Sequence, residues 1–273
     1  MTINCKGDLI DLSAPKIMGI LNVTPDSFYD GGKYASDKDL LLQTEKMLAY
    51  GATFIDVGAY SSRPNATPIS TDEEMKRLLP TIELLTKNFT DILISVDTFR
   101  AKIAQKSIEA GACMINDISG GNLDANMFNT VAKLQVPYVL MHMQGTPQNM
   151  QENPQYNHII KDIFFYFSDK LNQLRDLKVN DVILDVGFGF GKTLDDNYKI
   201  LKNLAFFKEF ELPLLVGTSR KSMLYKLLNG VPKNMLNATS VTNTIALLNG
   251  ANILRVHDVK EAKEAITIFN QIK

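Results

Sequence analysis

Eight short apolar runs recur along the chain, and nearly all of them end on a polar or charged residue. They predict strands at residues 16–21, 53–57, 92–96, 113–116, 138–141, 182–184, 214–216 and 253–256. Helical periodicity between the runs makes strands and helices alternate throughout. The polar residues at the run ends are Asn22, Asp56, Asp97, Asn116, His142, Asp185, Ser219, Arg255 and His257. The carboxyl ends of barrel strands share one face, so we expect these side chains around one pocket.

Strict alternation of strands and helices allows either a doubly wound open sheet or a closed barrel. Eight repeats within 273 residues favour the barrel, because (β/α)8 barrels run to about 250 residues. We therefore predict an α/β fold, a single-domain (β/α)8 TIM barrel over residues 1–273. Residues 22–35 and 58–70 form long loops after the first two strands, rich in Gly, Pro, Ser, Asp and Asn. Loops of this length usually bind or cover ligands, so we expect both to overhang the pocket.

Two predicted helices open with recognisable capping residues. Ser36 is expected to cap the helix after the first long loop, and Thr71 with Glu74 makes a capping-box pattern for the next. A long helix over residues 156–177 carries the apolar stretch 159–167. That stretch fits either a homodimer surface or core packing, and we predict a homodimer.

Composition narrows the class of protein. The formal net charge of -1 argues against nucleic acid or an anionic membrane as partner. No apolar stretch approaches the ~18 residues of a membrane span, and charges interrupt the first residues where a signal peptide needs an apolar core. A cytoplasmic protein is expected. Cys5 and Cys113 lack metal-ligand neighbours in the sequence, so two free thiols are expected.

Three acceptor-rich side chains end predicted strands three, four and six: Asp97, Asn116 and Asp185. Any one of them alone could be a structural ion-pair partner. Together they suit a ligand edge with several N–H donors, such as a 2-amino-4-oxo pteridine or a guanine ring, because buried polar groups must be paired.

The glycine-rich run after strand six, DVGFGFGKT from Asp185, fails as a nucleotide loop. A P-loop would need glycine at Val186, and the glycines have GxGxG rather than GxGxxG spacing. The glycines do permit a tight turn that projects Asp185 into the pocket and lays Phe190 beside a flat ligand. Met141 could line the same slot.

Basic residues end the last two strands. Lys221 lies where barrels often bind anions, and it is either a solvated helix-start residue or a partner for a ligand carbonyl or ring nitrogen near Asp185. Arg255 and His257 lie two residues apart, on one face of the strand, and suit a diphosphate. Arg255 could instead pair with Asp258 or another acid.

The remaining polar strand ends are assigned more simply. Asn22 could supply an oxygen to Mg²⁺ beside a diphosphate, although alone it would more often be a turn residue. His142 and Asp56 are expected to be structural. No Ser-His-Asp or Cys-His nucleophile system is evident in the sequence.

Taken in order, the motifs resemble the dihydropteroate synthase family. They are GILNVTPDSF from Gly19, SSRP from Ser61, SVDT from Ser95, ND from Asn116, MHMQGTP from Met141, GFGFGK from Gly187, SRK from Ser219 and RVHD from Arg255. The resemblance implies condensation of 6-hydroxymethyl-7,8-dihydropterin diphosphate with p-aminobenzoate, giving dihydropteroate and diphosphate for folate synthesis. It also implies a dissociative displacement with Mg²⁺ as cofactor.

The resemblance assigns roles to matching positions in this sequence. Pterin-binding positions are Asp97, Asn116, Met141, Asp185, Phe190, Gly217 and Lys221. Diphosphate positions are Asn22, Arg255 and His257, with Asn22 also on the metal. Positions on the p-aminobenzoate side are Phe28, Ser62, Arg63, Pro64 and Ser222. The catalytic set implied by the resemblance is Asp97, Lys221, Arg255 and His257.

Several positions depart from the commonest family pattern. Tyr60 stands where many members have Glu, Ser62 where many have Thr, Asn65 where Gly is usual, Tyr29 where Ser is frequent and Val186 where Pro is frequent. The first three lie in the second long loop, so the affected property is expected to be p-aminobenzoate binding. Two alternatives stay open: a pterin-dependent corrinoid methyltransferase and a catalytically silent pterin-binding barrel.

Overall fold

The computed structural model of the chain describes residues 1–23, 36–61 and 68–272. Its centre is a closed barrel of parallel strands in the order β10-β3-β4-β5-β6-β7-β8-β9. The strands are β3 (Lys16–Asn22), β4 (Phe54–Gly58), β5 (Ile94–Asp97), β6 (Met114–Asp117), β7 (Tyr138–Met141), β8 (Val182–Asp185), β9 (Leu214–Val216) and β10 (Ile253–Val256). The predicted (β/α)8 barrel is confirmed.

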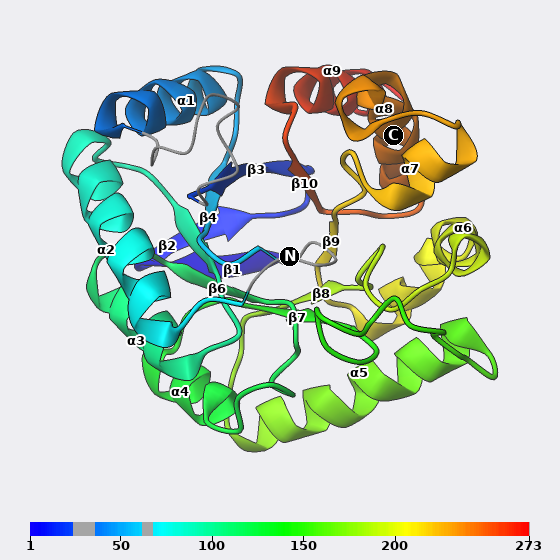
Figure 1. Cartoon of the computed structure of the whole chain (residues 1–273), viewed down its shortest axis with the longest axis horizontal. Helices are drawn as coiled ribbons and strands as arrows, with labels where there is room; N and C mark the ends of the chain where they lie inside the picture. The colour runs from blue at the N-terminus through cyan, green and yellow to red at the C-terminus, as the bar shows by residue number, and fades with distance from the viewer. Residues whose placement is uncertain (24–35, 62–67, 273) are drawn as a thin grey trace.

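Helices form a ring around the barrel (Figure 1). They are α1 (Asp37–Ala49), α2 (Thr71–Asn88), α3 (Ala101–Glu109), α4 (Met127–Leu134), α5 (Ile159–Asp176), α6 (Leu194–Lys202), α7 (Ser222–Leu227), α8 (Leu236–Leu248) and α9 (Val259–Phe269). Short 3₁₀ segments follow α6 at Leu204–Phe210 and α7 at Pro232–Asn234. In the described part of the chain, no helix has both the length and the apolar character needed to cross a membrane.

The sequence did not predict the antiparallel hairpin of β1 (Thr2–Cys5) and β2 (Asp8–Asp11). These strands of four residues each mix apolar with polar side chains, so they do not stand out as apolar runs. Ile3, Cys5 and Leu12 pack against inward-facing residues at the amino-terminal end of the barrel. The hairpin therefore forms the floor of the barrel.

Inward-facing side chains lie in layers because alternate residues of a strand face the same side. The layer that touches the hairpin is apolar: Met18, Phe54, Met114, Val139, Ile183, Leu215 and Ile253. Two residues further along the same strands lie Ile20, Asp56, Asn116, Met141, Asp185, Gly217 and Arg255. One step toward the carboxyl end thus changes the interior from apolar to charged.

The helix starts only partly follow the predictions. Ser36 caps α1 in a reciprocal capping box with Asp39, as expected for its side chain. The prediction for α2 was wrong: Ser70 is the cap, and its hydroxyl accepts a hydrogen bond from the Glu73 amide. The Glu74 carboxylate is instead buried against Thr98 and Arg100.

The apolar stretch of α5 is mainly core. Ile159, Ile160, Ile163 and Phe167 are buried, and Phe167 packs edge-on against Phe207. Of the six Ile and Phe side chains in this stretch, only Phe165 is well exposed, at 69%. Core packing accounts for most of this stretch, and its part in a dimer surface stays a prediction.

Candidate active site

An arginine clamped between two carboxylates forms the centre of the site. Arg255 Nε donates to Asp56 Oδ2 at 2.6 Å, and Nη2 donates to Asp97 Oδ2 at 2.8 Å. The Asn116 side-chain amide donates to the same Asp56 oxygen at 3.0 Å. Strands β4, β5, β6 and β10 thus bring their polar ends together, as the barrel topology requires.

Asp56 is the main functional residue that sequence reasoning missed. It was expected to be merely structural, yet its carboxylate orients both Arg255 and Asn116. Because the Asn116 amide nitrogen faces Asp56, its carbonyl oxygen is the end left to accept a hydrogen bond from a ligand. Asp56 is fully buried, and its Oδ1 makes no hydrogen bond to any residue that the structure describes.

The pKa of the Asp97 carboxyl group is higher than usual. Burial raises its pKa to about 7, Arg255 opposes that shift, and the negative charge of Asp56 adds to it. At neutral pH the group therefore exchanges readily between charged and neutral forms. Perturbed acidity together with a position in the pocket is typical of a residue that meets a ligand.

Asp185 and Lys221 lie on the opposite side of the barrel from Asp56. Asp185 Oδ1 accepts a hydrogen bond from the Gly187 amide at 2.7 Å. Burial raises the pKa of Asp185, and Lys221 lowers it. Lys221 Nζ donates to the Phe188 carbonyl at 2.6 Å and lies 4.6 Å from the centroid of the Phe190 ring. The ammonium of Lys221 is thus held between polar and aromatic groups rather than solvated at a helix start.

Burial lowers the pKa of Lys221 to about 8, and Asp185 opposes this shift while Arg255 adds to it. The structure thus places Lys221 near Asp185, and its role in binding stays a prediction. Its ammonium can hydrogen-bond a carbonyl or ring nitrogen while Asp185 accepts from neighbouring N–H groups. Such an arrangement suits the mixed donor and acceptor edge of a pteridine.

The glycine run after β8 is shaped by close backbone approaches. Gly187 and Gly191 have φ values of 71° and 62°, and added Cβ atoms there would lie 2.0 Å from the His142 carbonyl and 2.5 Å from the Gln144 carbonyl. Only glycine fits such contacts. The run therefore packs directly on the segment after β7, with Phe190 beside the cluster that contains Met141.

Lys192 is the second residue that sequence reasoning missed. Its ammonium contacts His142 Nδ1 at 3.0 Å and donates to the carbonyls of His142 and Phe190 at 3.2 and 3.0 Å. Burial lowers the pKa of Lys192 to about 7, with Asp185 opposing the shift. Lys192 thus links the segment after β7 to the glycine run after β8. The structural role expected for His142 is consistent with this contact.

The remaining predicted residues lie at the same rim. His257 Nδ1 and Ser219 Oγ are 3.0 Å apart, and the His257 amide donates to the same hydroxyl. Asn22 ends β3, Gly217 follows β9 and Ser222 begins α7. Asp258 pairs with Arg220, at 2.6 Å, which removes it as the alternative partner of Arg255. Phe28, Ser62, Arg63 and Pro64 lie outside the described residues, as do Tyr29 and Asn65.

A divalent cation would depend on donors from the substrate. The described residues include no group of three or more His, Cys, Asp or Glu side chains that could hold a metal. Asn22 supplies one amide oxygen at the rim. Mg²⁺ commonly takes one or two protein oxygens and completes its octahedron with phosphate oxygens and water. The donor set fits Mg²⁺ bound together with a diphosphate.

Comparisons with known proteins cover almost the whole chain. A family model described as pterin binding enzyme matches residues 18–257. The dihydropteroate synthase of Escherichia coli strain K12 is 43% identical over 270 residues, which cover 98% of this chain and 95% of that protein.

Solved structures share the fold closely. A Yersinia pestis dihydropteroate synthase structure with a sulfonamide drug complex has a TM-score of 0.94 at 43% identity, covering 100% of this chain and 99% of that one. A Xanthomonas albilineans dihydropteroate synthase structure with 4-aminobenzoic acid has a TM-score of 0.91 at 32% identity, covering 99% and 98%.

Proposed function

The chain belongs to the dihydropteroate synthase family of pterin-binding enzymes, and on that premise we propose how its own residues carry out the reaction. The reaction joins 6-hydroxymethyl-7,8-dihydropterin diphosphate to p-aminobenzoate and releases diphosphate. The observation that supports the residue roles best is the convergence of Asp97, Asn116, Arg255 and Lys221 at one barrel mouth.

The pterin ring binds deep in the mouth. Asp97, the Asn116 carbonyl and Asp185 accept hydrogen bonds from its N–H groups, and Lys221 donates to its oxygen or ring nitrogen. Met141 and Phe190 supply apolar walls, since both belong to the cluster beside the glycine run. Gly217 lies beside Arg255, because an added Cβ would lie 3.7 Å from the Arg255 Cβ, an ordinary van der Waals contact.

The diphosphate binds across β3 and β10. Arg255 Nε and Nη2 already contact carboxylates, whereas its Nη1 makes no hydrogen bond to any described residue. This third nitrogen and the His257 ring therefore face the departing group. Asn22 would hold a magnesium ion there, and that ion supplies additional charge neutralisation on the diphosphate.

Bond breaking precedes bond making. The bond between the pterin methylene carbon and the diphosphate oxygen breaks, and its electron pair leaves with diphosphate. Arg255 and His257 stabilise the growing negative charge, while ionised Asp97 stabilises the positive charge on the pterin. The p-aminobenzoate nitrogen then attacks the carbon and loses a proton to water. Binding of p-aminobenzoate is assigned to Ser222 at the start of α7 and to Phe28, Ser62, Arg63 and Pro64. A relative was solved with 4-aminobenzoic acid.

Turnover with defined substrates tests this function. The purified protein is incubated with the pterin diphosphate and p-aminobenzoate, with and without Mg²⁺, and both dihydropteroate and diphosphate are measured. We expect equal amounts of the two products and strong dependence on Mg²⁺. Binding of the pterin without turnover would identify a silent pterin-binding barrel. Methyl transfer from a methylated pterin to a corrinoid protein would identify the methyltransferase alternative.

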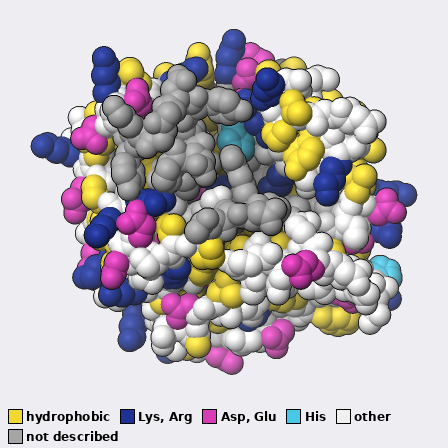
Figure 2. All heavy atoms as spheres, viewed as in Figure 1, with side chains coloured by type: hydrophobic (Ala, Val, Ile, Leu, Met, Phe, Trp, Pro, Cys, Tyr) yellow, Lys and Arg dark blue, Asp and Glu magenta, His cyan; other side chains and the backbone are white. Residues whose placement is uncertain are grey.

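We also propose that the protein is a homodimer through α7 and α8 rather than α5. Leu228, Val241 and Leu248 are 57%, 51% and 60% exposed, and Figure 2 shows hydrophobic side chains gathered over α7. Apolar patches of this kind mark interaction surfaces. Light scattering should give twice the chain mass, and Val241→Asp with Leu248→Asp should give a monomer. A wild-type monomer at high concentration would contradict this.

A further inference from the structure

Tyr60 occupies an unusual place at the rim of the site. It follows β4, and its ring packs edge-on against Phe99, with the two centroids 5.0 Å apart. The Arg100 guanidinium lies 5.6 Å from the Tyr60 centroid and 5.3 Å from the Phe99 centroid. The ring is therefore supported on two sides by residues at the start of α3.

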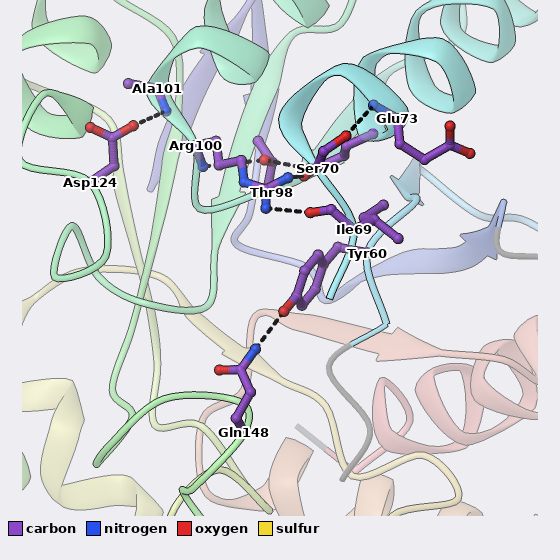
Figure 3. A network of polar contacts seen from close by, with 10 residues as sticks. Tyr60, Ile69, Ser70, Glu73, Thr98, Arg100, Ala101, Asp124 and Gln148 are labelled. Atoms are coloured by element: carbon purple, nitrogen blue, oxygen red, sulfur yellow. Dashed lines mark hydrogen bonds and ion pairs between the residues drawn. The ribbon is translucent and has the colours of Figure 1, made fainter. Parts of the chain in front are cut away.

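The supporting arginine is itself fixed. Arg100 pairs with the buried Glu74 carboxylate at 2.5 Å and donates to the Ile69 carbonyl at 2.7 Å. Thr98 donates to the other Glu74 oxygen at 2.7 Å. Figure 3 shows Thr98, Arg100 and Ile69 grouped on one side of Tyr60, with Gln148 on the other. The Tyr60 ring thus packs against an arginine that is held in place by Glu74 and Ile69.

The hydroxyl of Tyr60 reaches across the barrel mouth. The Gln148 side-chain amide donates to it at 2.7 Å (Figure 3). Gln148 belongs to the segment after β7, whose Met143 and Met150 pack with Met141 and Phe99 in one apolar cluster. The contact joins two segments that are 88 residues apart in sequence.

The position of this bridge decides which substrate it affects. The sheet order β4-β5-β6-β7 means that a bridge from β4 to β7 spans the ends of β5 and β6. Those ends carry Asp97 and Asn116. Arg255 and His257 come from β10 and Asn22 from β3, strands that lie outside the span of the bridge.

From this arrangement we infer that Tyr60 and Gln148 are positioning residues for the pterin substrate, resting on the proposed function. Their hydrogen bond holds the two segments over the ring edge that Asp97 and Asn116 bind, and so slows its release. The effect falls on the pterin, in contrast to the expectation from the sequence that this position governs p-aminobenzoate binding.

The test separates the hydroxyl from the ring. Tyr60→Phe keeps the aromatic packing and removes the hydrogen bond, while Gln148→Ala removes its partner. Each variant should raise the Kd of the pterin diphosphate with Mg²⁺ by about 2- to 10-fold, the range for one net hydrogen bond. Stopped-flow measurements should assign the change to faster dissociation. The KM for p-aminobenzoate should stay within about twofold, because neither substitution removes a group assigned to that substrate.

A double-mutant cycle and matched controls complete the experiment. Tyr60→Phe with Gln148→Ala should be no weaker than either variant alone. Tyr50→Phe just after α1 and Gln173→Ala on α5 should leave the Kd unchanged. Unchanged pterin dissociation in both single variants, or additive losses, would overturn the inference. A wild-type protein that forms no dihydropteroate would instead contradict the proposed function.

Discussion

The two ends of the barrel are built from the same strands but have opposite interiors. At the amino-terminal end, Phe54 and Ile253 face the hairpin in an apolar layer. Two residues further along those strands, the buried Asp56 and the partly buried Arg255 form an ion pair. Burial of apolar side chains stabilises the first end. At the second end, burial of charged groups costs desolvation energy, but these groups are available to bind a ligand. Within single strands of four or five residues, one inward-facing residue can therefore stabilise the fold while another is available to bind a ligand.

Substitutions at the barrel floor should lower the free energy of unfolding the most and leave ligand binding unchanged. Phe54 is fully buried, so Phe54→Ala should lower the free energy of unfolding by about 3 to 5 kcal/mol. Denaturant titration measures this loss, and calorimetry measures the affinity for the pterin diphosphate. Affinity should change less than about twofold. A large loss of affinity without a loss of stability would break the separation of the two ends.

Damage to the charged end should reduce catalysis. Arg255→Ala should lower kcat/KM by about 10² to 10³-fold, because it removes charge stabilisation in the transition state. His257→Ala should act in the same direction. Arg77→Ala on α2 removes another paired guanidinium and serves as the control. Near wild-type kcat/KM in both site variants would show that the roles of Arg255 and His257 are wrongly assigned.

The smallest expected effect is a pH dependence confined to the charged end. Burial raises the pKa of Asp97 to about 7, so its carboxylate is lost below that pH. Burial lowers the pKa of Lys221 to about 8, so its charge is lost above that pH. The kcat/KM for the pterin substrate should therefore be bell-shaped, falling about tenfold per pH unit on each side. Asp97→Asn should abolish the acid limb, and an unchanged limb would exclude Asp97 as its source.

The sequence predicted the barrel well because its signals are local. Apolar runs mark β7, β9 and β10 to the residue, and the polar run ends Asp97, Asn116 and Asp185 lie at the carboxyl ends of β5, β6 and β8. The hairpin was missed because its stabilising contacts lie with distant strands rather than within its own residues.

The missed site residues share a physical reason. Asp56 looked like any buried acid until its partner, 199 residues away in sequence, was known. Lys192 had no assigned role in the sequence, because its contacts with the ring and carbonyl of His142 span 50 residues. Contacts between residues far apart in the chain leave no pattern in the local sequence. The assignments of Phe28, Ser62, Arg63 and Pro64 stay predictions, because these residues lie outside the described part of the chain.

The hairpin at the barrel floor also constrains the order of assembly. It precedes every barrel strand in the chain, yet the Asn4 amide donates to Asp181 and the Asn252 side chain donates to the Leu12 carbonyl. The last of these contacts spans 240 residues. Contacts this distant form slowly, and domains assemble as the chain emerges from the ribosome. The hairpin is therefore synthesised first but packs against the barrel late. A nascent chain that lacks β10 cannot yet form the complete barrel floor that the hairpin covers.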